Sequence, residues 1–313
     1  MVTMKSESES ESKDVIATLR NVSKSYSGSL ALNNISLDIK RGEVLAILGA
    51  NGAGKTTLIN VMLGRLAIQA GEVQLFSSEP GSIAVKRNTG AMLQVASFPE
   101  TLKIKEHIQL FQSYYPCPMD YQQVLAYSGL ENMQNRYSRK LSGGEKQRLL
   151  FALSICGNPK LLFLDEPSAG MDLESRQRLW QAVGDLKKAG ASIVLTTHYM
   201  QEAEHLADRI LVLNQGQIVK QGSSEEIKAS VDHKILRFIS KVKSQVLCKL
   251  PDVVNVEISG KYSIVQSRHP VNTLHALFKL TLDIYDLSIS GADLEDAIIQ
   301  LNASQLNRKA VGE

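Results

Sequence analysis

The chain has few cysteines and no long apolar run, and both absences exclude classes of protein. Only three of its 313 residues are cysteine, namely Cys117, Cys156 and Cys248, and no two of them form a CxxC pair. These three residues do not suggest a disulfide framework or a zinc site, so we predict free or buried thiols in a reducing compartment. No stretch reaches the roughly 18 apolar residues that a membrane-spanning helix needs, so we expect no transmembrane segment.

The chain also has little excess of either positive or negative charge. The 35 Lys and Arg residues are nearly balanced by 32 Asp and Glu residues, for a formal net charge of +3. This balance gives no reason to expect nucleic acid held by a strong positive field. Residues 1–14 contain SESESESK and no apolar segment, so we expect a disordered tail there and no secretory signal.

The pattern of apolar residues in the remaining chain predicts two domains. Over residues 15–229, short apolar runs alternate with helical patterns, which predicts an α/β domain. Its expected strands are 16–22, 30–39, 43–48, 71–76, 161–164, 192–196, 210–213 and 217–221, and its expected helices are 55–66, 144–155, 173–189 and 200–207. Over residues 104–130 the pattern is helical and is interrupted by Pro116 and Pro118. Residues 230–313 predict a small α+β accessory domain without a catalytic motif, with strands 235–239, 253–258, 262–266 and 284–289 and helices 244–250, 271–278 and 293–301.

The strongest local motif is Gly49-Ala-Asn-Gly-Ala-Gly-Lys-Thr56, which fits the phosphate-loop pattern G-x-x-x-x-G-K-[ST]. An expected strand precedes it and an expected helix follows it, whereas an ordinary glycine turn would not require this context. The glycines let backbone N–H groups approach phosphate oxygens, and the helix N-terminus adds partial positive charge. We expect Lys55 to reach the β- and γ-phosphates and the Thr56 hydroxyl to bind Mg²⁺. The candidate nucleotide-binding residues here are Gly49, Ala50, Asn51, Gly52, Ala53, Gly54, Lys55, Thr56 and Thr57.

Two adjacent acids end the apolar strand 161–164. Many such pairs merely lie at exposed strand ends, but a phosphate loop in the same chain favours a catalytic role. Asp165 would then hold Mg²⁺, and Glu166 would act as the general base that polarises the attacking water.

A third motif, Leu141-Ser-Gly-Gly-Glu-Lys-Gln-Arg148, opens a short helix ahead of the acidic strand. A serine and two glycines at a helix start make a second anion-binding terminus. Since the chain already has one such site, the second suggests binding of the γ-phosphate of a nucleotide held by a partner subunit. The candidate residues are Ser142, Gly143, Gly144 and Glu145.

With these motifs the chain resembles an ATP-binding subunit of an ABC transporter, and LSGGEKQR matches the signature of that family. The resemblance covers about residues 15–230, with the motifs in the order and approximate spacing of the family. It implies a P-loop ATPase core with an antiparallel β subdomain and a helical lobe at about residues 95–155.

Further residues match family positions. Tyr26 matches the aromatic residue that stacks on adenine, and Gln94 matches the glutamine that contacts Mg²⁺ and the attacking water. Residues 168–172 match the loop that links the two ATP sites of a dimer. His198 matches the histidine that touches the γ-phosphate. Nearby Glu202, Glu204 and His205 could suggest a metal site, but we interpret them as one exposed helix face.

The resemblance implies ATP and Mg²⁺ as cofactors, a head-to-tail dimer of two ATPase subunits, and a partner permease that spans the membrane. It places the chain in the cytoplasm at the inner face of the cell membrane, bound through the permease, with no nucleic acid partner. The residues 169–171 and the ending Leu294-Glu-Asp296 are similar to those of bacterial drug and antibiotic exporters, which favours export over import. Ala50 replaces the proline common in the phosphate loop.

Two other functions are compatible with parts of this pattern. A soluble ATPase of the same superfamily could act mechanically on DNA or ribosomes, but the near-neutral charge and the lack of a long coiled coil speak against it. A regulatory ATP binder without turnover would require the loss of Lys55 or Glu166, and both are present.

Overall fold

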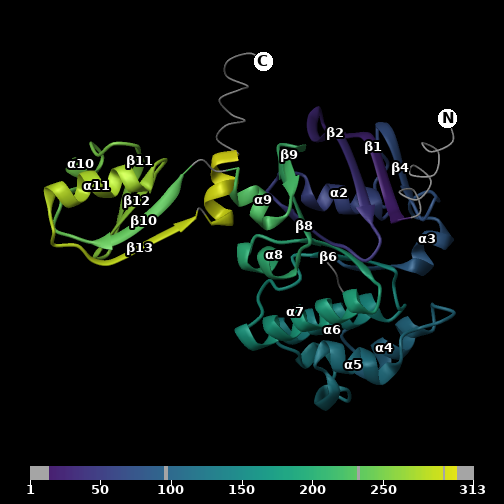
Figure 1. Ribbon diagram of the computed structural model, residues 1–313. Helices are drawn as coiled ribbons and strands as arrows, with labels where there is room; N and C mark the ends of the chain where they lie inside the picture. The colour runs from purple at the N-terminus through teal and green to yellow at the C-terminus, as the bar shows by residue number, and fades with distance from the viewer. Residues whose placement is uncertain (1–13, 95–97, 231–232, 292, 302–313) are drawn as a thin grey trace, which may run out of the picture. The chain divides into compact units, whose positions relative to one another are not determined.

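The computed structural model describes residues 14–94, 98–230, 233–291 and 293–301, which form two compact units (Figure 1). The first unit extends to Ser223 and the second begins at Ser224, ahead of the 229/230 boundary that we proposed from the sequence. The expected tail over residues 1–14 lies outside the described residues, except for Asp14.

A six-stranded sheet in the order β5-β6-β7-β3-β8-β9 forms the centre of the first unit. The strands are β3 (Val44–Leu48), β5 (Thr89–Met92), β6 (Leu161–Asp165), β7 (Ser192–Thr196), β8 (Arg209–Asn214) and β9 (Gln217–Gly222). All neighbours are parallel except β8 and β9. Every residue of β3, β6 and β7 is buried, as expected for central parallel strands that are covered on both faces.

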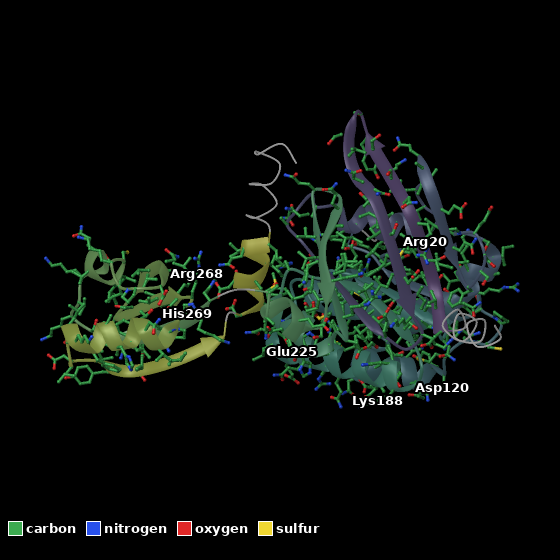
Figure 2. All side chains as sticks on the ribbon, turned by 45° about the horizontal axis from the view of Figure 1, so that its top comes forward. Arg20, Asp120, Lys188, Glu225, Arg268 and His269 are labelled. Carbon is green, nitrogen blue, oxygen red and sulfur yellow. The ribbon has the colours of Figure 1, made fainter. Side chains whose placement is uncertain are left out.

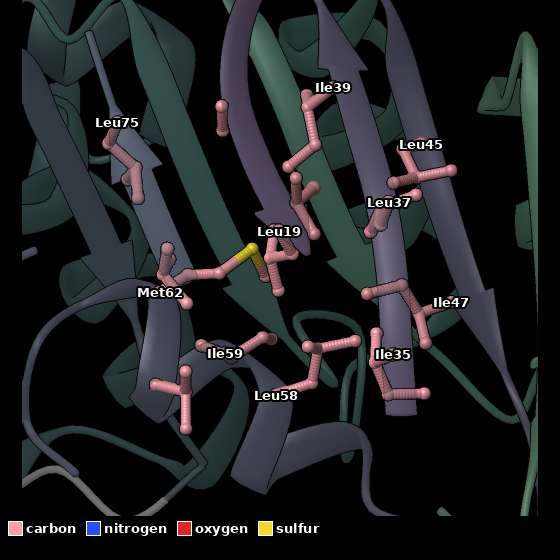
Figure 3. Close-up of a cluster of buried hydrophobic side chains, with 14 of the residues drawn as sticks. Leu19, Ile35, Leu37, Ile39, Leu45, Ile47, Leu58, Ile59, Met62 and Leu75 are labelled. Atoms are coloured by element: carbon pink, nitrogen blue, oxygen red, sulfur yellow. The ribbon is translucent and has the colours of Figure 1, made fainter. Parts of the chain in front are cut away.

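A separate antiparallel sheet, in the order β2-β1-β4, packs against this centre. It contains β1 (Val15–Tyr26), β2 (Ser29–Lys40) and β4 (Ala70–Leu75). Helix α2 (Lys55–Met62) shares one apolar cluster with both sheets (Figure 3), where Leu19, Ile35 and Leu58 are fully buried. Burial of these side chains fixes the start of α2 relative to the end of β3, and therefore the loop between them.

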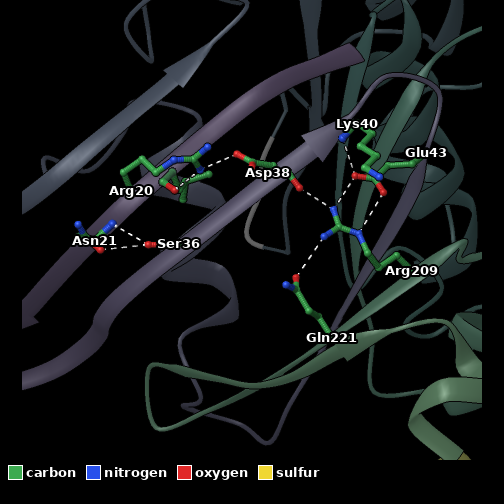
Figure 4. A network of polar contacts seen from close by, with 9 residues as sticks. Arg20, Asn21, Ser36, Asp38, Lys40, Glu43, Arg209 and Gln221 are labelled. Atoms are coloured by element: carbon green, nitrogen blue, oxygen red, sulfur yellow. Dashed lines mark hydrogen bonds and ion pairs between the residues drawn. The ribbon is translucent and has the colours of Figure 1, made fainter. Parts of the chain in front are cut away.

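A polar network joins the β2–β3 connection to β8 (Figure 4). The guanidinium of Arg209 donates to both carboxylate oxygens of Glu43, at 2.7 and 3.2 Å, and to the backbone oxygen of Asp38 at 2.6 Å. Another Arg209 nitrogen donates to Gln221 Oε1 at 3.1 Å. The paired donors and acceptors satisfy a carboxylate that is mostly buried, so they hold the register of these strands.

The helical part lies between β5 and β6 and continues after β6. It contains α4 (Ile104–Gln112), α5 (Tyr121–Ser128) and α6 (Gly143–Ile155), with two short 3-10 turns, η1 (Glu131–Met133) and η2 (Ser138–Lys140). The expected interruption at Pro116 and Pro118 is confirmed, since both prolines lie between α4 and α5. Helices α7 (Leu173–Lys188) and α8 (Met200–Leu206) follow β6 and β7.

Apart from the 3-10 turns, two elements of the first unit were missed in the sequence, α3 (Ile83–Asn88) and β5. Both are short, so neither shows a repeating apolar pattern. Helix α2 also ends at Met62, before the predicted end at residue 66. Gly64 follows in a left-handed conformation, and a Cβ there would meet the backbone of Pro80 at 2.5 Å, so the chain turns away from the helix at this point.

The second unit is a four-stranded antiparallel sheet with helices. Its elements are α9 (Ser224–Lys228), β10 (Lys234–Ile239), α10 (Ser244–Leu247), β11 (Val253–Ser259), β12 (Tyr262–Ser267), α11 (Pro270–Leu280), β13 (Tyr285–Gly291) and a helix over residues 294–301, and the strand order is β11-β12-β10-β13. Leu236, Phe238 and Val265 form its core with Leu247 and Leu277. The expected α+β unit is confirmed.

Charged side chains of both signs project from the surface of the first unit, for example those of Arg20, Asp120 and Lys188 (Figure 2). Among the described residues, no helix combines the length and the apolar character required to cross a bilayer.

Candidate nucleotide-binding site

The phosphate loop occupies the turn between β3 and α2. Gly54 caps α2 with a φ of 108°, and a Cβ at this position would meet the backbone oxygen of Ala31 at 2.4 Å. A Cβ on Gly49 would meet the backbone oxygen of Leu213 at 2.2 Å. Both glycines are therefore required by close backbone approach, and at Gly54 also by a left-handed conformation.

Lys55 is the first residue of α2 and is only 7% exposed. Its Nζ donates to the backbone oxygens of Gly49 at 2.7 Å and Ala50 at 3.3 Å. An ammonium group has three N–H donors, so one remains for an oxygen of a phosphate lying in the loop. The buried stem holds this charge in place.

The end of β6 lies beside the start of α2. Asp165 is 2% exposed, and its carboxylate accepts from the hydroxyl of Thr56 at 3.1 Å and from that of Thr196 at 2.5 Å. Thr196 ends the neighbouring strand β7. The expected meeting of Asp165 with the phosphate loop is therefore present in the structure.

Glu166 follows Asp165 in a left-handed conformation with a φ of 53°. Its backbone N–H donates to the backbone oxygen and to the hydroxyl oxygen of Thr196, both at 3.1 Å. Non-glycine residues with such a backbone cluster at functional sites, where the surrounding structure enforces them. The Glu166 carboxylate binds His198 Nδ1, so the two predicted catalytic residues contact each other.

A cavity of about 460 Å³ lies among the phosphate loop, Asp165 and Glu166, and His198 is not part of its described lining. It is lined by Tyr26, Ala31, Asn51, Gly52, Gly54, Lys55, Thr56, Thr57, Gln94, Asp165 and Glu166. Tyr26, from the antiparallel sheet, is 45% exposed, so its ring is accessible to a planar ligand. A larger cavity of about 590 Å³ between α2 and β4 contains none of the motif residues.

The LSGG segment forms the start of α6, away from this cavity, whose described lining includes none of residues 142–145. Ser142 Oγ accepts from the backbone N–H of Glu145 at 3.3 Å, and Glu145 Oε2 accepts from that of Ser142 at 2.7 Å. Arg136 pairs with Glu145 at 2.7 Å. These hydrogen bonds, led by the Ser142 N–H, lower the pKa of Glu145 below its usual range. Glu145 therefore acts within its own chain as part of a helix cap.

Comparison with known proteins agrees with this geometry. The sequence profile of the ABC transporter family matches residues 32–169. The daunorubicin/doxorubicin resistance ATP-binding protein DrrA of Streptomyces peucetius is 30% identical over 309 residues, which cover 93% of each chain. The Nod factor export ATP-binding protein I of Rhizobium johnstonii is 35% identical over 217 residues, 66% of this chain and 69% of that protein. This chain belongs to the ABC transporter family.

Other ABC proteins extend the comparison. The mouse ABC-type organic anion transporter ABCA8B is 32% identical over 300 residues, and the match spans only 18% of that protein. A dimeric ATP-binding cassette in a post-hydrolysis state, bound to ADP and Pi, has a TM-score of 0.61 and 25% identity, and the match covers 66% of this chain and 98% of that chain. The chain is accordingly an ATP-hydrolysing subunit of an ABC transporter.

The oxygen groups near the phosphate loop of this ABC subunit suit a magnesium ion. Thr56 and Asp165 are hydrogen-bonded to each other, and Gln94 lines the same cavity. Among the described residues, no group of three or more His, Cys, Asp or Glu side chains could form a metal site. Mg²⁺ is usually bound by one or two protein oxygens together with substrate phosphates and water, and Thr56, Asp165 and Gln94 offer oxygens of this kind.

One sequence interpretation in the ABC subunit was wrong. Glu202 does not lie on an exposed helix face with Glu204 and His205, because its side chain is fully buried. Its carboxylate accepts a hydrogen bond from Trp180 Nε1 at 2.9 Å. Trp180 belongs to α7. The local pattern of α8 does not reveal that α7 packs against it.

Sequence reasoning also missed two residues of this ABC site. Thr196 bonds both Asp165 and the Glu166 backbone, and Ala31 lines the cavity. Thr196 could have been found, because the ends of neighbouring parallel strands meet at one edge of a sheet. Ala31 has no side-chain chemistry that would mark it.

Proposed function

We propose that this ABC subunit hydrolyses ATP to power export through a separate membrane permease, with which it associates at the cytoplasmic face of the membrane. The observation that supports this most is the phosphate-loop cavity, where Lys55, Asp165 and Glu166 converge on one ligand-sized space. The relatives named for drug resistance and for Nod factor export favour the export direction. We expect the permease to select the cargo.

We further propose that two copies pair head to tail, with each ATP held between the phosphate loop of one copy and the LSGG segment of the other. Gly143 supports this arrangement. A Cβ at Gly143 would meet nothing within 4 Å, and its φ is not positive. Its own chain therefore gives no steric reason for glycine, whereas a phosphate approached closely by the helix start would give one.

In this arrangement each residue has a defined task. Tyr26 stacks on the adenine, and the residues of the phosphate loop, from Gly49 to Thr57, donate backbone N–H groups to the phosphates. Lys55 balances charge that develops on the transferred phosphoryl group. Glu166 orients and deprotonates the attacking water, while His198 and Gln94 contact the γ-phosphate side of the site.

A magnesium ion would be held by Thr56 and Gln94 together with Asp165, and it would neutralise phosphate charge when bound. The hydrogen bonds of Asp165 to two threonine hydroxyls orient its carboxylate for this role. Loss of the γ-phosphate would remove the shared ligand between the two copies and let them separate.

Glu166→Gln tests the assignment of the general base. The amide cannot accept the water proton but keeps nearly the same size, so ATP binding should persist while turnover falls by at least about 100-fold. Size-exclusion chromatography with MgATP should show an accumulated dimer. Turnover is measured as phosphate release.

Glu174→Gln is the matched control, since Glu174 is an exposed residue that pairs with Arg178 on α7. It should hydrolyse ATP at the wild-type rate. Normal turnover in Glu166→Gln would contradict the role of Glu166 as the general base. If the subunit were purified from solubilised membranes without a protein that spans the membrane several times, the proposed permease partner would be contradicted.

A further inference from the structure

We propose that Trp180 and Glu202 are positioning residues, which hold His198 toward the γ-phosphate through the contact between α7 and α8. This inference rests on the role proposed above for His198. We call the contact, made by Arg176, Trp180, Tyr199 and Glu202, the α7–α8 clamp.

The first part of the clamp is a hydrogen bond to a buried carboxylate. Glu202 is fully buried, and its Oε1 accepts from Trp180 Nε1 at 2.9 Å. The indole also stacks on the ring of His205, with centroids 5.1 Å apart. Glu202 and His205 are one helical turn apart on α8, so both fix the same face of that helix against Trp180.

The second part lies one turn earlier on both helices. The guanidinium of Arg176 lies over the ring of Tyr199, 4.7 Å from its centroid. Arg176 and Trp180 are four residues apart on α7, and Tyr199 and Glu202 are three residues apart at the start of α8. Both pairs therefore lie on facing sides of the two helices.

The clamp ends directly at the catalytic histidine. Tyr199 follows His198 in the chain, and the centroids of their two rings lie 4.1 Å apart. The backbone N–H of Tyr199 donates to Thr197 Oγ1 at 3.0 Å. The short turn before α8 is therefore held by a ring contact and by a backbone hydrogen bond. A rotation of α8 about its axis would consequently displace His198 from Glu166.

The chemistry of Glu202 argues for more than packing. Glu202 Oε2 is buried and has no hydrogen-bond partner among the described residues. The bond from the Trp180 indole to Glu202 gives the contact between α7 and α8 a defined geometry, which an apolar pair at these positions would not impose.

The clamp also joins two parts of the ATP site. Asp172 is the N-cap of helix α7, and its side chain accepts from Ser175 N–H at 2.7 Å. Helix α8 begins after His198. A change at the loop of residues 168–172 would thus reach the histidine through two rigid helices and their contact.

The test uses Trp180→Phe, which keeps an aromatic ring but removes the donor. We expect kcat for ATP to fall about tenfold, since small misplacement of a catalytic group has large effects, while KM stays within about twofold. Glu202→Leu should cause the same loss, and Glu202→Gln, which retains an acceptor for the indole, should restore most of kcat. Leu186→Ala, a buried change on α7 away from the clamp, is the control that lowers the melting temperature but not kcat.

A double-mutant cycle separates positioning from general damage. In a His198→Ala background, Trp180→Phe should change residual turnover by less than about twofold. An equal tenfold loss in both backgrounds, or an unchanged kcat in Trp180→Phe, would overturn the clamp. Full turnover in His198→Ala alone would instead contradict the proposed role of His198.

Tryptophan fluorescence provides a further readout, which also applies to variants that fold poorly. Trp180 is the only tryptophan of the chain, so its emission reports the clamp directly. In Glu202→Gln the emission should match the wild type, and in Glu202→Leu it should shift. Identical spectra in Glu202→Leu and the wild type would show that the bond does not hold the indole, and would overturn the proposal.

Discussion

At the residue scale, His107 shows how burial and hydrogen bonding set the behaviour of one side chain. It is fully buried in α4, and its Nε2 lies 3.2 Å from Ser138 Oγ. Ser138 Oγ also bonds the backbone oxygens of Pro99 and Leu102, at 3.0 and 3.1 Å. Desolvation lowers the pKa of His107, and this effect exceeds the opposing influence of the Pro99 carbonyl.

This burial predicts a loss of stability in mild acid. The folded state favours neutral His107, whereas the unfolded state binds a proton near the usual pKa of about 6.5. The free energy of unfolding should therefore decrease as the pH falls from about 6.5 toward the lower folded-state pKa. Urea unfolding at a series of pH values measures this slope.

His107→Asn provides the comparison, because asparagine can bond Ser138 but does not titrate. Its pH dependence should be flatter than that of the wild type in this range. Parallel curves for the wild type and His107→Asn would rule out His107 as the cause.

At the element scale, the start of α6 combines two independent requirements. The capping box of Ser142 and Glu145, extended by Arg136, stabilises the helix within its own chain. Gly143 lies in open space between them. The cap is thus a contact within the chain, whereas the proposed dimer would give Gly143 its role, a close approach from outside the chain.

These requirements predict opposite effects for two substitutions. Glu145→Ala should lower the free energy of unfolding of the nucleotide-free chain by about 1 kcal/mol, because it removes half of the capping box. Gly143→Ala should leave stability the same or raise it by up to about 1 kcal/mol, since alanine favours helix. It should, however, weaken ATP-driven pairing in the Glu166→Gln background.

Thermal unfolding without nucleotide and light scattering with MgATP measure the two effects. If Gly143→Ala destabilised the isolated chain as much as Glu145→Ala, the glycine would have an intrachain role. If pairing were unaffected by Gly143→Ala, the LSGG segment would not approach the nucleotide of a second copy.

At the scale of the whole molecule, the dimer proposed above splits each ATP site between two copies. The cavity of one chain contains the phosphate loop and the acids but not the LSGG segment. A closed two-fold pair with head-to-tail contacts gives two equivalent complete sites. Each chain then contributes one half of each of the two ATP sites.

This division predicts complementation between two inactive variants. Lys55→Ala and Gly143→Ala should each hydrolyse ATP poorly, because every site in either homodimer lacks one half. A mixed dimer contains one site with an intact Lys55 from one copy and an intact Gly143 from the other. With random pairing, turnover of the mixture should rise to about one quarter of the wild type.

Phosphate release before and after mixing measures the gain. Two differently tagged Lys55→Ala preparations should gain nothing when they are mixed. A mixture of Lys55→Ala and Gly143→Ala that only averages the two separate rates would show that each chain hydrolyses ATP alone.

The amino-acid sequence alone was enough to predict the motifs and most of the elements that carry them. The phosphate loop, the Asp165–Glu166 pair and the LSGG segment depend on local rules: backbone access at glycines, the short length of buried strands, and helix starts that bind anions. The order of strands and helices follows from apolar periodicity, which is also local. Only short elements such as α3 and β5 escaped.

The tertiary structure decided which distant residues meet. Thr196 reaches Asp165 because β6 and β7 lie side by side, and Trp180 reaches Glu202 because α7 packs on α8. The periodicity of α8 alone suggested an exposed acidic face. This prediction was wrong because burial depends on what covers a helix and not on the helix itself. Contacts of this kind depend on the packing of elements far apart in the chain, so no local pattern encodes them.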